Sequence, residues 1–125
     1  MTILDQRRSR YLQDTLPIRL GGIAANLSRV ASFSKHAGIQ ETVSDILLES
    51  RWFIEWIASE LEVTKAAVLV KLQVQLALWD LESRQNWGDE KWRGVLANEA
   101  NQWSQRILEM SGLMPPRVAV PNDGQ

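Results

Sequence analysis

Apolar residues recur at spacings of three and four along most of this chain, which is the period of helices that bury one face. The pattern predicts four helices of nearly equal length, at about residues 17–36, 41–61, 65–84 and 89–111. Pro17 suits a first helical turn, Gly38 is expected to end the first helix, and Asp89 is expected to cap the fourth. Helices of this number and length predict an all-α fold, a four-helix antiparallel (up-down) bundle.

The predicted helices divide the chain into three parts. Residues 1–15 are expected to form an N-terminal arm or short helix, residues 16–112 the bundle domain, and residues 113–125 an extended or disordered, proline-containing tail. A break between the second and third helices is expected near Glu62 to Thr64, with Thr64 as N-cap. No glycine or proline marks this break, so one continuous helix is the alternative.

The predicted second helix carries two apolar faces. The face expected to pack in the core consists of Val43, Ile46, Leu47, Phe53, Ile54, Ile57 and Leu61. A second row, nearly opposite, consists of Leu48, Trp52 and Trp56. Full burial of such a side chain is worth roughly 1.5–3 kcal/mol, so this row is expected to be covered. A second copy or another protein is the favoured cover, and the chain's own termini or a small-molecule ligand are the alternatives.

The predicted third helix is apolar almost all round. Its residues also alternate as in a β-strand, but the length of the segment and the lack of a partner strand favour a helix. Polar residues interrupt it on two strips, one with Lys71, Gln75 and Glu82 and the other with Gln73 and Asp80. A helix with this pattern is expected to be buried on more than one side, which again indicates a covering partner.

The first helix places four small residues on one side, Gly21, Ala25, Ser28 and Ser32. Such a row allows another backbone to approach closely, so these four residues join Leu48, Trp52 and Trp56 as candidate interface residues. Two adjacent glycines within a helix each cost about 1 kcal/mol relative to alanine, so Gly21 and Gly22 indicate a kink equally well.

Composition and charge contribute mainly by exclusion. The 125 residues are 45% hydrophobic and include no cysteine, which removes disulfides, thiolate metal sites and cysteine nucleophiles. Without a secretory signal or a run of about 18–20 apolar residues, we expect a cytoplasmic protein that is not an integral membrane protein. Residues 1–35 carry six basic and two acidic side chains, whereas residues 36–90 carry four and ten. This asymmetry predicts helices that attract one another, and three clustered arginines at residues 7–10 are too few to indicate nucleic-acid binding.

The chain shows no recognisable catalytic or cofactor chemistry. Its one histidine, His36, is too few for a di-iron or bis-histidine haem site. The glutamates of the second helix lack the spacing of magnesium-dependent pyrophosphohydrolases, and Gly21 and Gly22 lack the strand and lysine of a phosphate-binding loop. We therefore expect no enzyme activity, no cofactor and no metal, and name no catalytic residue.

Three strings, Ser32–Lys35, Glu49–Trp56 and Trp103–Leu113, resemble segments of a family of small uncharacterised cyanobacterial all-helical proteins. The resemblance implies a cytoplasmic protein. Because no activity is assigned to that family, it implies no site residues.

The sequence therefore predicts a non-catalytic protein–protein interaction or assembly module, either a homodimer or a partner of another protein. Leu48, Trp52 and Trp56 are the expected anchors. The first alternative is a bundle that binds a small, pigment-like molecule among indoles and Met110 or Met114. The second is an enzyme with an unrecognised site.

Overall fold

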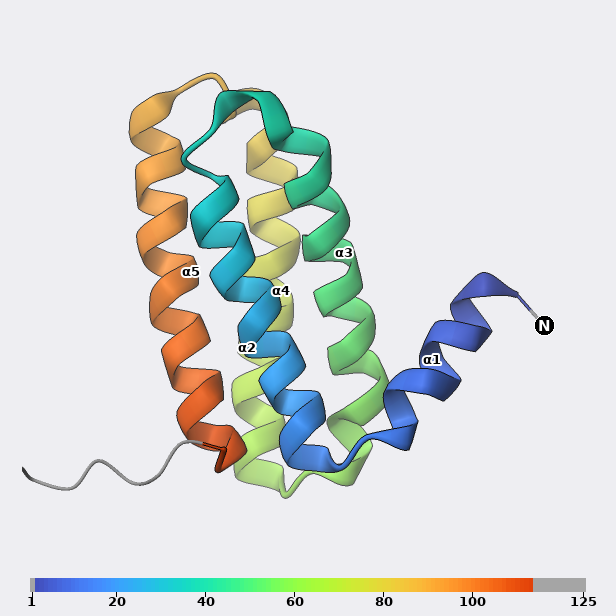
Figure 1. Cartoon of the computed structure of the whole chain (residues 1–125). Helices are drawn as coiled ribbons and strands as arrows, with labels where there is room; N and C mark the ends of the chain where they lie inside the picture. Colours follow the sequence, from blue (N-terminus) through green and yellow to red (C-terminus); the bar gives the residue numbers. More distant parts are fainter. Residues whose placement is uncertain (1, 114–125) are drawn as a thin grey trace, which may run out of the picture.

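The computed structural model describes residues 2–113, and within this range the chain is almost entirely helical. The elements are α1 (Ile3–Gln13), α2 (Leu16–Phe33), α3 (Gln40–Ile57), α4 (Val63–Asn86) and α5 (Glu90–Ser111), with 3-10 turns at Ala37–Ile39 and Ala58–Glu60. Helices α2 to α5 stand side by side and connect at alternating ends, and α1 lies to one side against α3 (Figure 1). The all-α fold class is confirmed.

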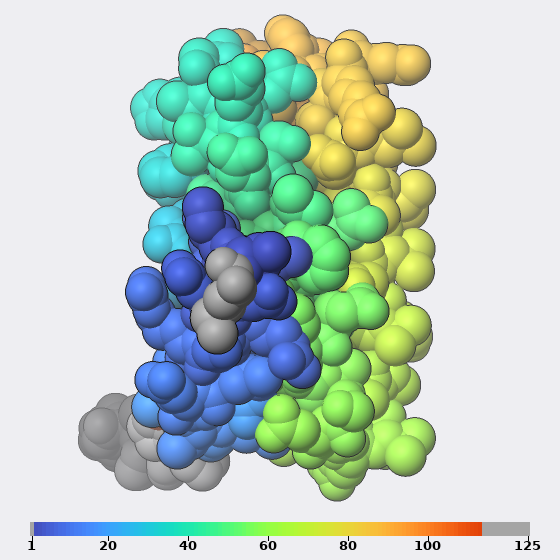
Figure 2. Space-filling model, turned by 90° about the vertical axis from the view of Figure 1, so that its right-hand side faces the viewer, coloured from blue at the N-terminus to red at the C-terminus, as the bar shows by residue number. Residues whose placement is uncertain are grey.

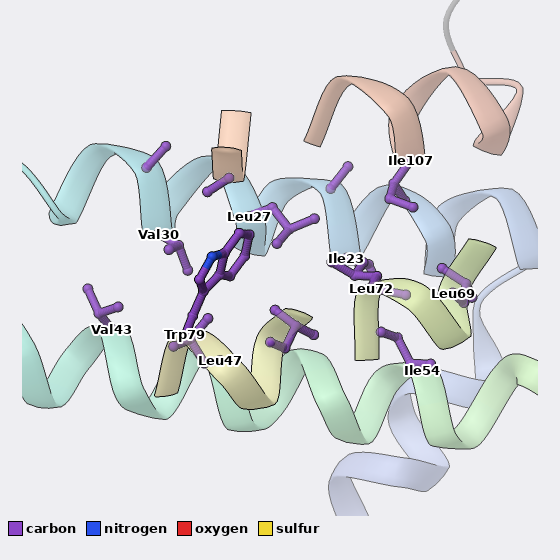
Figure 3. Packing of buried hydrophobic residues seen from close by; sticks show 14 of the residues in the cluster. Ile23, Leu27, Val30, Val43, Leu47, Ile54, Leu69, Leu72, Trp79 and Ile107 are labelled. Atoms are coloured by element: carbon purple, nitrogen blue, oxygen red, sulfur yellow. The ribbon is translucent and has the colours of Figure 1, made fainter. Parts of the chain in front are cut away.

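The core is formed by aliphatic side chains that α2, α3, α4 and α5 direct inward (Figure 3). Each helix supplies residues at the spacings that the sequence pattern predicts, and the largest fully buried ones are Ile23, Leu27, Leu47, Ile57, Leu69, Leu72, Leu76, Leu96 and Ile107. The indole of Trp79 extends from α4 toward Leu27 and Val30 of α2 (Figure 3). Helix α4 contributes the buried side chains of Leu69, Leu72, Leu76 and Trp79, and Val68 packs partly buried against them.

Helices α2 and α5 approach each other most extensively because small residues lie between them. Ala24, Ala97 and Ala100 are buried, and the Ser104 hydroxyl donates a 2.7 Å hydrogen bond to the carbonyl of Ala24. A buried hydroxyl bonded to a neighbouring backbone satisfies its own polarity while it keeps the two helices close.

Helix α2 ends at Phe33, slightly before the predicted end at residue 36. The Ser34 hydroxyl donates to the carbonyl of Val30, and the buried Arg93 guanidinium donates to the carbonyl of Ser34. The Val30 carbonyl also accepts the last helical bond, from the Ser34 backbone N–H, and the next two N–H groups donate to carbonyls three residues back. Arg93 occupies the Ser34 carbonyl, which a continuing helix would use. Trp87 then covers this end of the molecule, with its indole N–H bonded to the carbonyl of Ala37 at 2.7 Å.

The chain breaks between α3 and α4, but the details differ from the prediction. Helix α3 ends at Ile57 rather than at residue 61, and Glu62, not Thr64, is the N-cap of α4. An ion pair between Arg19 and Glu60 stabilises the 3-10 turn, a long-range contact that local sequence does not reveal. At the other end of α4, Asp89 caps α5 as predicted by accepting from the backbone N–H groups of Lys91 and Trp92. Of the predicted tail, only Leu113 is among the described residues.

Replacing Ser104 with leucine tests the close α2–α5 contact. We expect Ser104→Leu to lower the free energy of unfolding by roughly 1–3 kcal/mol, because a larger side chain must push the helices apart. The exposed neighbour provides the control Gln105→Leu, which is expected to change it by less than about 0.5 kcal/mol. Urea denaturation measures both, and equal effects of the two variants would contradict the proposed packing.

Candidate protein interface

The candidate interface begins with the aromatic row on α3, part of which is covered by α1. The ring of Tyr11 stacks on Phe53 with centroids 4.0 Å apart, and lies 6.0 Å from the ring of Trp56. Trp56 of α3 is half-buried and packs against the core. In the N-terminal segment, every residue from Thr2 to Arg10 is exposed, and Tyr11 is buried. Trp56 is therefore covered by α1, the chain's own N-terminal helix.

Tyr11 and Arg19 hold α1 in this place. The Tyr11 hydroxyl donates a 2.7 Å hydrogen bond to the carbonyl of Arg19, and the Arg19 guanidinium makes a two-pronged bond to the Glu60 carboxylate at 2.7 and 2.9 Å. The hydrogen bonds and positive charge of Arg19 lower the pKa of Glu60, while burial raises the pKa of the Tyr11 phenol well above its usual value. This Tyr11–Arg19–Glu60 cluster joins α1, α2 and the turn before α4.

Leu48 and Trp52 remain exposed beside α1. Leu48 is 50% exposed and Trp52 is 37% exposed, and the Trp52 ring stacks on Trp56 with centroids 6.1 Å apart. A groove between α1 and α3 is lined by Ile3, Leu4, Arg7, Asp45, Leu48, Glu49 and Trp52. Figure 2 shows α1, in dark blue, lying across this side of the molecule beside the green α3. An ion pair of 3.6 Å between Arg7 and Glu49 joins the two helices at this groove.

The four small residues of α2 are not brought together with this aromatic row. Ala25, Ser28 and Ser32 are exposed, whereas a Cβ at Gly21 would overlap the side chain of Leu113. Gly21 therefore leaves space for Leu113, which lies two residues beyond the end of α5. Gly21 itself lies within an unbroken α2.

The longest exposed apolar surface belongs to α4. Opposite its buried face, six apolar residues lie in one row along the whole helix, at spacings of three and four: Val63, Ala67, Val70, Val74, Leu78 and Leu81. The exposed fraction of the five larger side chains ranges from 46% at Leu78 to 84% at Val63. We call this row the α4 outer stripe. The sequence pattern predicts that α4 is apolar almost all round, but it places the expected interface anchors on α3.

Polar residues border the α4 outer stripe on both sides. On the side toward α3, Gln73 donates to Glu55 at 3.3 Å, and Asp80 accepts from Ser44 at 2.9 Å. On the other side lie the exposed side chains of Lys71 and Glu82. No ion pair within residues 2–113 involves Lys71 or Glu82. An apolar centre between polar margins is the usual composition of a protein interface.

Leu48 and Trp52 lie beside the middle of this stripe. The bonds from Ser44 to Asp80 and from Gln73 to Glu55 show which levels of α3 and α4 face each other. Leu48 and Trp52 fall between Ser44 and Glu55, and a shallow groove lined by Leu48, Arg51, Trp52, Glu55 and Gln73 joins α3 to α4. Gln73 and the polar margin of α4 therefore lie between Leu48 and Trp52 on one side and the α4 outer stripe on the other.

Other kinds of site find little support in the described part of the chain. Residues 2–113 contain no group of three or more histidine, cysteine or acidic side chains placed to hold a metal ion. Within the same range, no helix is long and apolar enough to cross a membrane. Met110 packs against the core, and Met114 lies outside the described residues.

Comparison of the chain with protein-family models, curated proteins and solved structures found no match. The resemblance to small cyanobacterial proteins therefore stays a prediction.

Removing the Tyr11 ring should release α1 from the rest of the molecule. We expect Tyr11→Ala to accelerate tryptic cleavage after Arg7, Arg8 and Arg10 several-fold, because a helix held by one buried side chain opens more often without it. The control Gln13→Ala, at an exposed position of α1, should leave the cleavage rate unchanged. Mass spectrometry of timed digests measures both rates. Equal rates for the two variants would show that Tyr11 does not hold the helix.

The single tyrosine also permits a direct titration. Because burial raises the pKa of Tyr11 in the folded protein, its stabilising effect is complete below the unfolded value of about 10 and is lost as pH rises through the folded value. We expect tyrosinate absorbance to appear above pH 10 and to coincide with release of α1. Tyr11→Phe provides the blank. An ordinary titration centred near pH 10, with α1 still bound, would contradict the burial of this phenol.

Proposed function

We propose that this protein is a non-catalytic interaction module that forms a homodimer through the α4 outer stripe, with Leu48 and Trp52 beside it. The observation that carries the proposal is the pattern of α4. Its inner face already packs in the core, yet six further apolar residues continue along the opposite face from Val63 to Leu81. Contiguous exposed apolar surface of this kind marks sites of association.

The spacing of the stripe favours a helix as the partner. Four stripe residues and the half-buried Ala77 beside them follow one another at alternating steps of three and four, which is the spacing of residues that interlock between two packed helices: Ala67, Val70, Val74, Ala77 and Leu81. A second copy of the same chain offers a matching stripe without any other component, and closed twofold dimers are the commonest protein assemblies.

Dimerisation on an outer helix leaves the interior of each copy intact. We assign α2 to α5 to the antiparallel, up-down four-helix class, because consecutive helices reverse direction and pack around one core (Figure 1). In that class an outer helix face is free for association without repacking. Trp56 is then a packing residue under α1, and Trp52 and Leu48 are the aromatic and aliphatic anchors at the margin of the interface.

Light scattering after size exclusion tests this function. The wild-type protein should show twice the mass of one chain, and Val70→Glu/Val74→Glu should be a monomer with unchanged helicity, because both side chains are exposed within one copy. The matched control Asn98→Glu/Asn101→Glu places the same charges on exposed positions of α5 and should remain a dimer.

Two results would contradict the proposal. One is a wild-type protein that elutes with the mass of one chain at every concentration. The other is a Val70→Glu/Val74→Glu variant that remains a dimer, particularly if Trp52→Glu alone converts the protein to a monomer. In that case the α1–α3 groove would be the site of association.

A further inference from the structure

We propose that the two copies pair α4 against α4 in antiparallel orientation, about a twofold axis between Gln75 and Leu76, so that Lys71 of each copy binds Glu82 of the other. This inference rests on the proposed self-association and specifies its geometry. Three features of the stripe and its margins lead to it.

The first feature is the match of side chains along the stripe. An antiparallel pair centred between residues 75 and 76 places Val70 opposite Leu81 of the second copy, and Val74 opposite Ala77, which lies half-buried beside the stripe. At each of the two middle layers, the larger Val74 then meets the smaller Ala77, and the two helices approach most closely there. The twofold axis repeats each pair, so four apolar layers form from two kinds of contact.

The second feature is charge. Lys71 and Glu82 are eleven residues apart, about three helical turns, and so lie on the same flank of the stripe. When two identical helices pack antiparallel, like flanks face each other, which brings each Lys71 beside Glu82 of the other copy. Both side chains are exposed and neither has an ion-pair partner within residues 2–113.

The competing arrangements lose this pairing. In a parallel pair, unlike flanks meet, and Lys71 would lie opposite the uncharged Ala66 of the second copy. Asp80 on that flank is already bonded to Ser44 and lies 3.8 Å from Arg84. In the antiparallel register shifted by one heptad, Val70 faces Val74 and the two Lys71 ammonium groups meet at the axis. Charge at the margin of an interface selects register and orientation in this way.

The third feature is the position of the exposed α3 residues. Leu48 lies at the level of the middle of α4, between the Ser44–Asp80 and Gln73–Glu55 contacts. Because α3 borders the flank opposite Lys71, the antiparallel arrangement places α3 of both copies on the same side. Leu48 and Trp52 of the two copies then flank the axis and add apolar surface to the dimer.

Disulfide trapping distinguishes these arrangements, because the chain contains no cysteine of its own. In Val70→Cys/Leu81→Cys, the two thiols of one copy are roughly 16 Å apart along α4, which is too far for an internal disulfide. We expect this double variant to form a covalent dimer under mild oxidation, seen by mass spectrometry. Val70→Cys alone and Leu81→Cys alone should stay uncrosslinked, because neither residue meets its own equivalent.

Charge exchange provides a second, independent readout. Lys71→Glu and Glu82→Lys should each raise the dimer Kd about tenfold, since symmetry turns each substitution into two repulsive contacts. The combined variant Lys71→Glu/Glu82→Lys restores opposite charges and should return the Kd to within about threefold of wild type. Sedimentation equilibrium at low salt measures all four proteins.

The outcomes separate the geometry from the function. A wild-type dimer in which both single-cysteine variants crosslink would establish a parallel pair and overturn this inference alone. A wild-type dimer that no cysteine variant crosslinks would place the interface elsewhere and also overturn it. A wild-type monomer would overturn the proposed function itself.

Discussion

Helix α4 carries apolar side chains on two opposite faces, and the structure depends on the burial of one of them. One face, Leu69, Leu72, Leu76 and Trp79, closes the core against the other helices. The other, the α4 outer stripe, has no such cover within residues 2–113. Because an apolar side chain gains roughly 1.5–3 kcal/mol from full burial, we propose that a second protein surface covers the outer face. The proposed dimer supplies that surface from the chain itself.

The N-terminal helix shows how the same requirement is met inside one chain. Tyr11 covers Phe53 and Trp56 with its ring, while its hydroxyl and the Arg19–Glu60 ion pair satisfy the polar groups that this burial brings inward. Both long-range ion pairs of the described residues, Arg7–Glu49 and Arg19–Glu60, join the basic start of the chain to its acidic middle. The uneven charge seen in the sequence therefore serves contact between helices, as predicted.

The sequence predicted most of the helices and core because both follow a local period. The apolar spacing of α5 and the cap at Asp89 can be recognised from neighbouring residues alone. The ends of α2 and α3 could not be placed, because Ser34–Arg93 and Arg19–Glu60 join residues far apart in sequence. The same holds for Trp56. Trp56 is covered by Tyr11, the one aromatic residue of the polar helix α1. Nothing in the local sequence shows that this ring packs on Trp56. The row Leu48, Trp52 and Trp56 therefore appeared more exposed than it is.

In the proposed dimer, a second copy covers the α4 outer stripe in solution. Isotope-filtered NMR of a mixture of labelled and unlabelled chains tests it directly at the methyl groups of Val70 and Val74. If the two stripes pack together, these methyls show nuclear Overhauser contacts to side chains of the other chain, foremost Leu81 and Ala77. Methyls of Val70 and Val74 that show contacts only within their own chain and to solvent water would contradict it.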